Sequence, residues 1–268
     1  DGWKRCGPCV FGDLVVGKRS GLCYGPDLRR RRRHWKLEEM NGFTTLNDLD
    51  LELLPRRRRG RLVNSLSGFK SANLVGTTSV HGVHNLSIIS SVVHLGSDPA
   101  LLGMVFRPPV DPAQGSHSYW NIRETGCFTL NHVPASLTAK AHQASARYPQ
   151  DTDEFEALGF TPIFRCGFEA PAVEESPVRI GMERVDEWEI PQNRCRFVVA
   201  QIRWVEFPEE ALCGDGYLDL EGLDVAALSS LDGYHRTQKL HRLGYAKPES
   251  GAPELMEDFM RGWKDEEV

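Results

Sequence analysis

The stretch that decides the fold runs from Asn85 to Pro109 and reads NLSIISSVVHLGSDPALLGMVFRPP. Its first half alternates apolar residues with small polar ones, which predicts a strand with one buried face and one face lined by small groups. Ser97-Asp98-Pro99 is a turn signal, and the apolar run Ala100–Phe106 predicts a second, buried strand. Arg107 follows at once, and two prolines then stop the strand.

This hairpin has two interpretations. A cluster of small hydroxyls beside a strand-end arginine can hold a flat polar ring and an anionic phosphate. An ordinary hairpin with serines on its solvent-exposed face gives the same pattern. The residues of the hairpin alone leave both interpretations open.

Short strands with turn punctuation continue on both sides of the hairpin. The predicted strands are Ser71–Thr78, Asn85–Leu95, Leu101–Arg107, Cys127–Val133, Val178–Val185 and Arg196–Phe207. The predicted helices are Ser136–Arg147 with Ser136 as N-cap, Asp151–Leu158 closed by Gly159, a turn at Asn121–Glu124 and a terminal helix at Met256–Trp263. Leu223–Leu231 and Tyr234–Leu243 are weaker candidates for helix or loop. The pattern predicts a mainly β fold, an antiparallel barrel decorated with helices.

Several classes of protein are disfavoured. The sequence shows no alternation of strands and helices, no GxGxxG and no GxxxxGK[ST], which disfavours dinucleotide-binding Rossmann domains and P-loop NTPases. No GxSxG elbow marks a hydrolase. The histidines lack a carboxylate that would complete a metal set, so we expect no metal site. No apolar run approaches the roughly 20 residues that cross a bilayer, and we expect a soluble, cytoplasmic protein.

The net charge of −5 hides an asymmetry along the chain. Residues 1–61 carry 15 Lys and Arg against 8 Asp and Glu, whereas the remainder carries 17 against 29. The basic excess comes mainly from Arg29–Arg33 and Arg56–Arg59. Such runs bind nucleic acid or are simply solvated. The sparse aromatic residues between them disfavour a base-stacking surface.

The amino-terminal segment contains Cys6-Gly7-Pro8-Cys9, the pattern of a redox dithiol. That chemistry requires a preceding buried strand, and only five residues come before Cys6. The total of 7 cysteines is odd and their positions are scattered, which favours reduced thiols. We expect residues 1–39 to be a disordered extension outside the domain. We expect a basic lead-in over 40–61, the domain over 62–248 and a tail over 249–268.

Several blocks in collinear order resemble the flavin reductase-like family, and more narrowly the flavoredoxin-type branch of the FMN-binding split barrels. Besides the hairpin, they are NSLSGFKSANLVGT (Asn64–Thr77), HSYWNIRETGCFTLNH (His117–His132), AHQASARY (Ala141–Tyr148), ESPVRIG (Glu175–Gly181) and LDGYHRTQKLHRLGYAKP (Leu231–Pro248). The resemblance implies a six-stranded antiparallel split barrel with Greek-key topology. It also implies a homodimer with FMN near the subunit interface.

The resemblance further implies hydride transfer from NADH or NADPH to the flavin, with electrons passed to free flavin or to an acceptor protein. It implies no catalytic side chain, because the cofactor carries the chemistry. The residues that it points to as flavin contacts are Asn85, Ser87, Ser90, Ser91, Val92, Arg107, Ser116, His117, Ser118, His235 and Tyr245. Arg236, Lys239 and Arg242 are interpreted instead as a solvated helix face.

Two other functions stay open. One is an FMN-containing electron carrier that does not itself oxidise NAD(P)H. The other is a nucleic-acid-binding or interaction protein that uses the basic arm of residues 1–61.

Overall fold

The structure is a computed structural model and describes residues 43–165, 167–248 and 255–256. The chain divides into two units, Asp1–Glu52 and Leu53–Val268. In the first unit, the described residues include the start of helix α1 (Asp48–Leu53), which a reciprocal pair of bonds caps. Asn47 N donates to Asp50 Oδ2 at 3.1 Å and Asp50 N donates to Asn47 Oδ1 at 3.0 Å.

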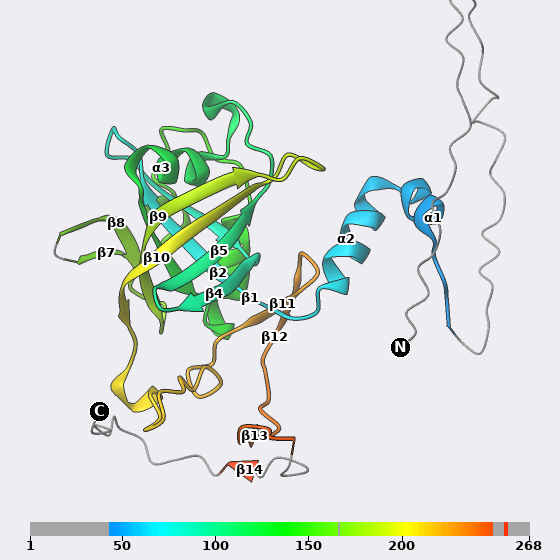
Figure 1. Cartoon of the computed structure of the whole chain (residues 1–268). Coiled ribbons are helices and arrows are strands. Elements are labelled where there is room, and N and C mark those ends of the chain that lie inside the picture. The colour runs from blue at the N-terminus through cyan, green and yellow to red at the C-terminus, as the bar shows by residue number, and fades with distance from the viewer. Residues whose placement is uncertain (1–42, 166, 249–254, 257–268) are drawn as a thin grey trace, which may run out of the picture. The chain divides into compact units, whose positions relative to one another are not determined.

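The second unit is built on one antiparallel sheet (Figure 1). Its strands are β2 (Asn73–Thr78), β3 (His84–Ile89), β4 (Val92–Ser97), β5 (Ala100–Phe106), β6 (Cys127–His132), β9 (Arg179–Glu189) and β10 (Arg196–Glu206). They lie in the order β3-β2-β6-β9-β10-β5-β4. Strands are present wherever the sequence predicts them, with boundaries that differ by a few residues, but the single strand predicted over Asn85–Leu95 is divided into β3 and β4.

The two ends of this sheet are formed by one continuous piece of chain. Only Ser90 and Ser91 separate β3, which pairs with β2, from β4, which pairs with β5. Counted as one bent strand, β3 and β4 close the sheet into a barrel of six strands. Because β6 returns to lie beside β2 after the β2–β5 meander, the topology is a Greek key. The predicted split-barrel fold is confirmed.

Local chemistry explains the bend and the turns. Ser91 Oγ donates to Val105 O at 2.6 Å, and Val105 N donates to Ser91 O at 3.1 Å. The bend is therefore tied to β5 although Ser91 belongs to neither strand. The turn between β4 and β5 falls at Asp98-Pro99, as predicted.

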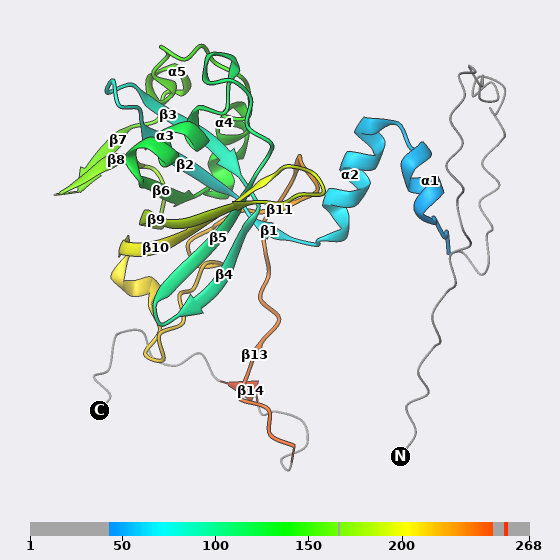
Figure 2. The same ribbon diagram turned by 45° about the horizontal axis from the view of Figure 1, so that its top comes forward.

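The two faces of the strands pack into separate hydrophobic clusters. On one face of β2, Leu74 packs with Phe155 and other residues of helices α4 (Thr138–Gln143) and α5 (Glu154–Leu158). On the other face, Val75 packs with Tyr119 and Ile122 of helix α3 (His117–Thr125). Figure 2 shows α4 and α5 near each other, with α3 lying across the end of the barrel. This alternation is the period-2 pattern of a strand that is buried on both faces.

The helices differ in detail from the predictions. The helix expected over Ser136–Arg147 is a 3-10 turn, η3 (Ala135–Leu137), followed by α4, and Ser136 is not its N-cap. The chain tightens there because Leu137 N bonds back to Pro134 O at 3.0 Å. The predicted turn at Asn121–Glu124 belongs to the longer helix α3. The helix predicted from Asp151 begins at Glu154 instead, capped by Asp153, and Gly159 closes it as predicted.

The C-terminal part of the domain forms strands where helix or loop was expected. β11 (Ala227–Ser229) pairs with β1 (Lys70–Ser71) and with β12 (Gly233–His235). The prediction of a helix face shared by Arg236, Lys239 and Arg242 is wrong, because these described residues form no helix. Arg236 pairs instead with Asp224 at 2.8 Å, and Arg242 with Asp215.

Other elements were not predicted from the sequence. They are helix α2 (Arg56–Leu66), the 3-10 turns η2 (Pro112–Gln114) and η4 (Glu209–Ala211), and strands β7 (Pro162–Arg165), β8 (Phe168–Val173), β13 (Arg242–Leu243) and β14 (Leu255–Met256). Arg56–Arg59 begins α2. Residues 1–39 with the Cys6–Cys9 motif, and residues 257–263 of the predicted terminal helix, lie outside the described residues. Within the part of the chain that the structure describes, no helix combines the length and the apolar character needed to cross a membrane.

Gly76 lies at a close backbone crossing in the barrel, and this crossing generates a prediction. A Cβ at this position would collide with the backbone oxygen of Pro171 on β8 and lie 2.6 Å from Thr129 Oγ1. We expect Gly76→Ala to lower the free energy of unfolding by about 1–3 kcal/mol, the usual cost of overpacking. Gly60 lies in α2, and a Cβ added there would meet nothing within 4 Å, so Gly60→Ala should be neutral or stabilising. If urea unfolding shows the same change in the free energy of unfolding for both variants, Gly76 is not closely packed against Pro171 and Thr129.

Candidate functional site

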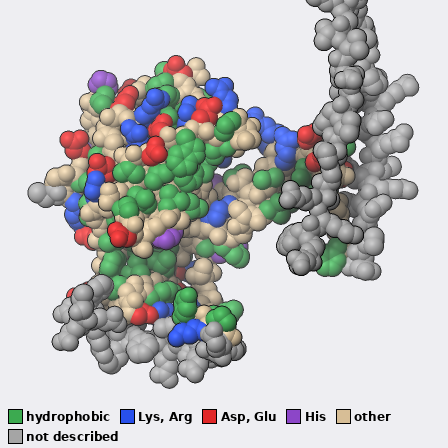
Figure 3. Space-filling model, in the orientation of Figure 1, with side chains coloured by type: hydrophobic (Ala, Val, Ile, Leu, Met, Phe, Trp, Pro, Cys, Tyr) green, Lys and Arg blue, Asp and Glu red, His purple; other side chains and the backbone are tan. Residues whose placement is uncertain are grey.

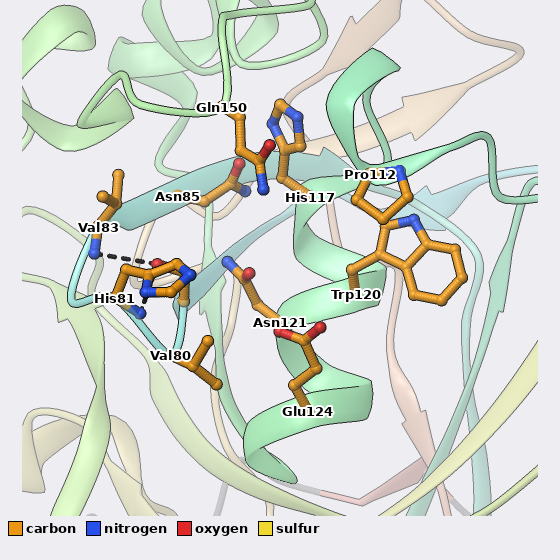
Figure 4. A pocket seen from close by; sticks show the side chains of 11 residues that line it. Val80, His81, Val83, Asn85, Pro112, His117, Trp120, Asn121, Glu124 and Gln150 are labelled. Atoms are coloured by element: carbon orange, nitrogen blue, oxygen red, sulfur yellow. Dashed lines mark hydrogen bonds between the residues drawn. The ribbon is translucent and has the colours of Figure 1, made fainter.

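A small cavity lies between the β2–β3 turn and helix α3 (Figure 4). Its volume is about 100 Å³. It is lined by Ser79, Val80, His81, Val83, Asn85, Pro112, His117, Trp120, Asn121, Glu124 and Gln150. The lining combines apolar walls with amide, imidazole and carboxylate groups. At this size the cavity can admit one polar edge of a ligand, whereas a whole small-molecule site occupies roughly 300–1,000 Å³.

Three of the predicted contact residues are joined directly beside this cavity. The strand period places Asn85 and Ser87 on the face of β3 that meets α3. Ser118 Oγ on α3 lies 2.7 Å from the amide of Asn85 and 2.6 Å from Ser87 Oγ. Next to them, Asn121 Nδ2 donates to Thr77 Oγ1 at 3.0 Å. A seam of hydrogen bonds thus holds α3 against the barrel.

A buried carboxyl group extends this seam. Glu154, at the start of α5, is 5% exposed. Because β3 ends the sheet on this side, the N–H of Leu86 points outward, and it donates to Glu154 Oε2 at 2.9 Å. Burial raises the pKa of Glu154 from 4.5 to about 7, with Asp153 adding to the rise and the Leu86 N–H opposing it.

The N-terminus of α3 is suited to an anion. Ser116 precedes the helix with a left-handed φ of 62°, and its side chain does not cap the helix. Its hydroxyl accepts instead from Val110 N at 3.2 Å, and Trp120 Nε1 donates to Val110 O at 2.9 Å. These bonds tie the loop after β5 to the helix start. Among the described residues, no side chain caps the first-turn N–H groups, which is the usual arrangement of a phosphate site.

Arg107 and the bend residues lie along the same loop and strands. Arg107 is exposed directly after β5, three residues before Val110. Ser90 and Ser91 form the bend between β3 and β4, where the Ser91 hydroxyl hydrogen is already used by Val105 O. Val92 begins β4 and packs against the barrel interior.

The two C-terminal predictions are not brought to this seam by any contact that the structure describes. His235 lies on β12, where its Nε2 is 2.8 Å from Ser229 Oγ and its ring meets the edge of Phe69. Tyr245 is 90% exposed. Within one chain, therefore, neither residue adds to the cluster of Asn85, Ser87 and Ser118.

The sequence reasoning missed two lining residues and the buried carboxyl group of the seam. Gln150 and Glu154 carry no motif, Trp120 lies in a matched block but was given no role, and the turn at Asn121–Glu124 was predicted without a role. His117 was predicted, and its Nε2 is buried with no hydrogen-bond partner among the described residues. A buried, unpaired ring nitrogen is costly, which is consistent with a ligand that completes the site.

The raised pKa of Glu154 generates a prediction for stability. Between pH 4.5 and about 7 the unfolded chain releases this proton while the folded protein keeps it. The free energy of unfolding that Glu154 contributes therefore falls as pH rises through this window, and the penalty is complete above it. The free energy of unfolding of Glu154→Gln should therefore rise relative to that of the wild type. We expect this difference to grow by on the order of 2 kcal/mol between about pH 5 and pH 8.

Urea unfolding at both pH values measures this difference. His132 acts in the opposite sense, because burial lowers its pKa to about 4 and its contribution is lost as pH falls. Comparing the variant with the wild type removes that effect. If the free energy of unfolding changes with pH in the same way in both proteins, Glu154 does not keep its proton in the folded state.

Comparison with known proteins identifies the family. Residues 66–219 match the flavin reductase like domain, and no curated protein matches the chain. A candidate flavin reductase with a split barrel domain from Shewanella frigidimarina is 43% identical, with a TM-score of 0.72 over 76% of this chain and 100% of that one.

More distant structures share the fold alone. Flavoredoxin of Desulfovibrio vulgaris is 22% identical, with a TM-score of 0.56 over 69% of this chain and 93% of that one. An FMN-binding protein from Thermus thermophilus is 15% identical, with a TM-score of 0.51 over 63% and 86%. The family match covers more than half of the chain, and the solved structures share its barrel fold. The chain belongs to the flavin reductase-like domain family.

Proposed function

We propose that this protein binds FMN at the seam between β3 and α3 and transfers hydride from NADH or NADPH to it. The observation that carries the proposal is the uncapped start of α3, to which the loop that follows Arg107 is bonded, in a chain that belongs to this family. The flavoredoxin and the FMN-binding protein that share its fold are flavin proteins by name. When bound, the flavin supplies the two-electron chemistry.

The side chains divide the work of binding. The N–H groups of the first turn of α3 and the guanidinium of Arg107 would hold the phosphate, whose charge a helix N-terminus also favours. Ser87, Ser90 and backbone groups at the bend would bond the polar edge of the ring. The unpaired Nε2 of His117 would gain a hydrogen-bond partner there. None of these groups needs to transfer a proton, which agrees with the expectation of no catalytic side chain.

A homodimer fits the exposed apolar surface of the barrel. Phe197 on β10 lies against Trp188 on β9, with ring centroids 4.9 Å apart, and reaches across Gly103 on β5 towards Leu95 on β4. Figure 3 shows hydrophobic side chains gathered near the centre of the same face. Such a patch is a usual protein–protein contact. We propose that Tyr245, which is 90% exposed, contacts the flavin site of the other chain in this dimer.

Phosphate binding by Arg107 can be tested with two flavins. We expect Arg107→Ala to raise the Kd for FMN about tenfold, the size of one lost charge-assisted bond, and to leave the Kd for riboflavin unchanged. Arg203→Ala is the matched control, because Arg203 pairs with Glu183 on the barrel surface. Quenching of flavin fluorescence measures all the affinities. If Arg107→Ala weakens the binding of FMN and riboflavin equally, Arg107 does not bind the phosphate.

Hydride transfer is tested by the absorbance of the loaded protein. Under anaerobic conditions, we expect NADH or NADPH to bleach the visible flavin band of the FMN complex within seconds to minutes. Dithionite is the control that shows the flavin to be reducible. Bleaching by dithionite alone would favour the electron-carrier alternative. A protein that stays colourless after FMN addition and desalting would contradict the whole proposal.

A further inference from the structure

Helix α2 begins with a run of exposed cations. Its first turn is Arg56–Arg59, and all of these side chains except that of Arg59 are exposed. In the second turn, Arg61 pairs with Asp232 at 3.4 Å, whereas the three exposed arginines form no ion pair with another described residue. Three positive charges therefore lie at the surface without a counter-charge from the described part of the domain.

This run of cations does not stabilise the helix in which it lies. The positive end of the helix dipole is at the first turn, so cations there are unfavourable, and this turn contains no acidic residue that would offset them. Pro55 precedes the helix, and no side chain caps it. A partner that brings negative charge to this turn would remove the unfavourable interaction.

An exposed apolar edge lies on the same helix. At about 3.6 residues per turn, Leu62, Val63 and Leu66 fall within about 100° of one another around the helix axis. Val63 is 49% exposed and Leu66 is 72% exposed. Phe69, shortly after the end of the helix, is 70% exposed. The second half of α2 thus presents apolar side chains to solvent.

The charged and apolar surfaces adjoin in a way that favours one kind of partner. Around the helix axis, Arg56 and Arg58 fall on either side of the arc that contains Val63 and Leu66. Cations that flank exposed apolar side chains are typical of helices that lie on an anionic lipid surface. A surface for single-stranded nucleic acid would instead offer aromatic side chains to the bases, and Val63 and Leu66 are aliphatic.

The rest of the domain holds α2 in place. Ser230 Oγ, in the turn between β11 and β12, donates to Arg61 O at 3.0 Å. Lys70 Nζ donates to Asn64 O at 2.9 Å. Because these bonds fix the second half of the helix, α2 is a preformed part of the domain and need not fold when it binds.

We propose that α2 docks the protein on anionic lipid headgroups, with Arg56–Arg58 against the phosphates and with Leu66 and Phe69 in the interface. The inference goes beyond the proposed function and does not depend on it. Salt screens exposed charges, and two or three apolar side chains give little insertion by themselves. We therefore expect docking to need both the charges and the apolar edge.

Sedimentation of the full-length protein with lipid vesicles tests the inference. One set of vesicles is phosphatidylcholine alone, and the other contains about 30% phosphatidylglycerol, both in about 0.15 M salt. The charge variant combines Arg56→Gln, Arg57→Gln and Arg58→Gln. Gln forms helices about as readily as Arg, and the first turn loses unfavourable cations, so α2 should persist. Circular dichroism checks the folding of each variant.

Two controls match the variants elsewhere on the surface. The control for charge combines Arg147→Gln, Arg194→Gln and Arg203→Gln, which removes the same net charge away from α2. The apolar variant is Leu66→Ser, and its control is Leu240→Ser, because Leu240 is 86% exposed in the C-terminal part of the domain.

We expect the wild type to bind the anionic vesicles and not the neutral ones. The charge variant should bind the anionic vesicles about tenfold more weakly or worse, and Leu66→Ser about three- to tenfold more weakly. Both controls should bind as the wild type does.

Several results would overturn the inference and leave the flavin site untouched. They are a wild type that binds neither kind of vesicle or both equally, and a charge control that loses as much affinity as the charge variant. If the charge variant binds like the wild type, another segment such as Arg29–Arg33 holds the lipid. If Leu66→Ser keeps full affinity, α2 attracts any polyanion, nucleic acid included, and is not a lipid surface.

Discussion

One constraint organises this structure: a single segment of chain must pair at both ends of the same sheet. β3 and β4 are consecutive, yet β3 bonds to β2 and β4 to β5. The two-residue link between them therefore has to bend sharply, and the backbone and hydroxyl of Ser91 bond Val105 to hold it there. Closure of the antiparallel strands into a barrel follows from this pairing.

The same bend borders the site that we propose. Ser90 and Ser91 leave the regular ladder, and Asn85 and Ser87 of β3, close to the bend in sequence, bond Ser118 of α3. The helix then presents its uncapped N-terminus on the same side of the barrel, where the loop after Arg107 is bonded to it. In the site that we propose, the groups that would bond the flavin ring and its phosphate come from a few residues on neighbouring elements. Such a small set is enough if the cofactor carries the reaction.

Much of the barrel was predictable because its signals are local. The alternation in Asn85–Leu95, the turn at Ser97–Pro99 and the apolar run that follows each report the conformation of adjacent residues. The cluster of Asn85, Ser87 and Ser118 followed from a family resemblance, and the structure brings these three residues together. The placement of Glu154 could not be predicted, because its partner is a backbone N–H 68 positions away in the chain. Likewise, β11 and β12 are short strands that exist through pairing, β11 with β1 and β12 with β11, and no periodicity in Leu223–Leu243 signals that pairing.

A crystal structure of the protein grown with FMN tests the central claim most directly. The account predicts the ring against the bend between β3 and β4, with a polar atom of the flavin within hydrogen-bonding distance of Ser87. It predicts the phosphate at the first turn of α3 beside Arg107. Flavin density at another surface of the barrel, with the start of α3 in contact only with solvent, would contradict it.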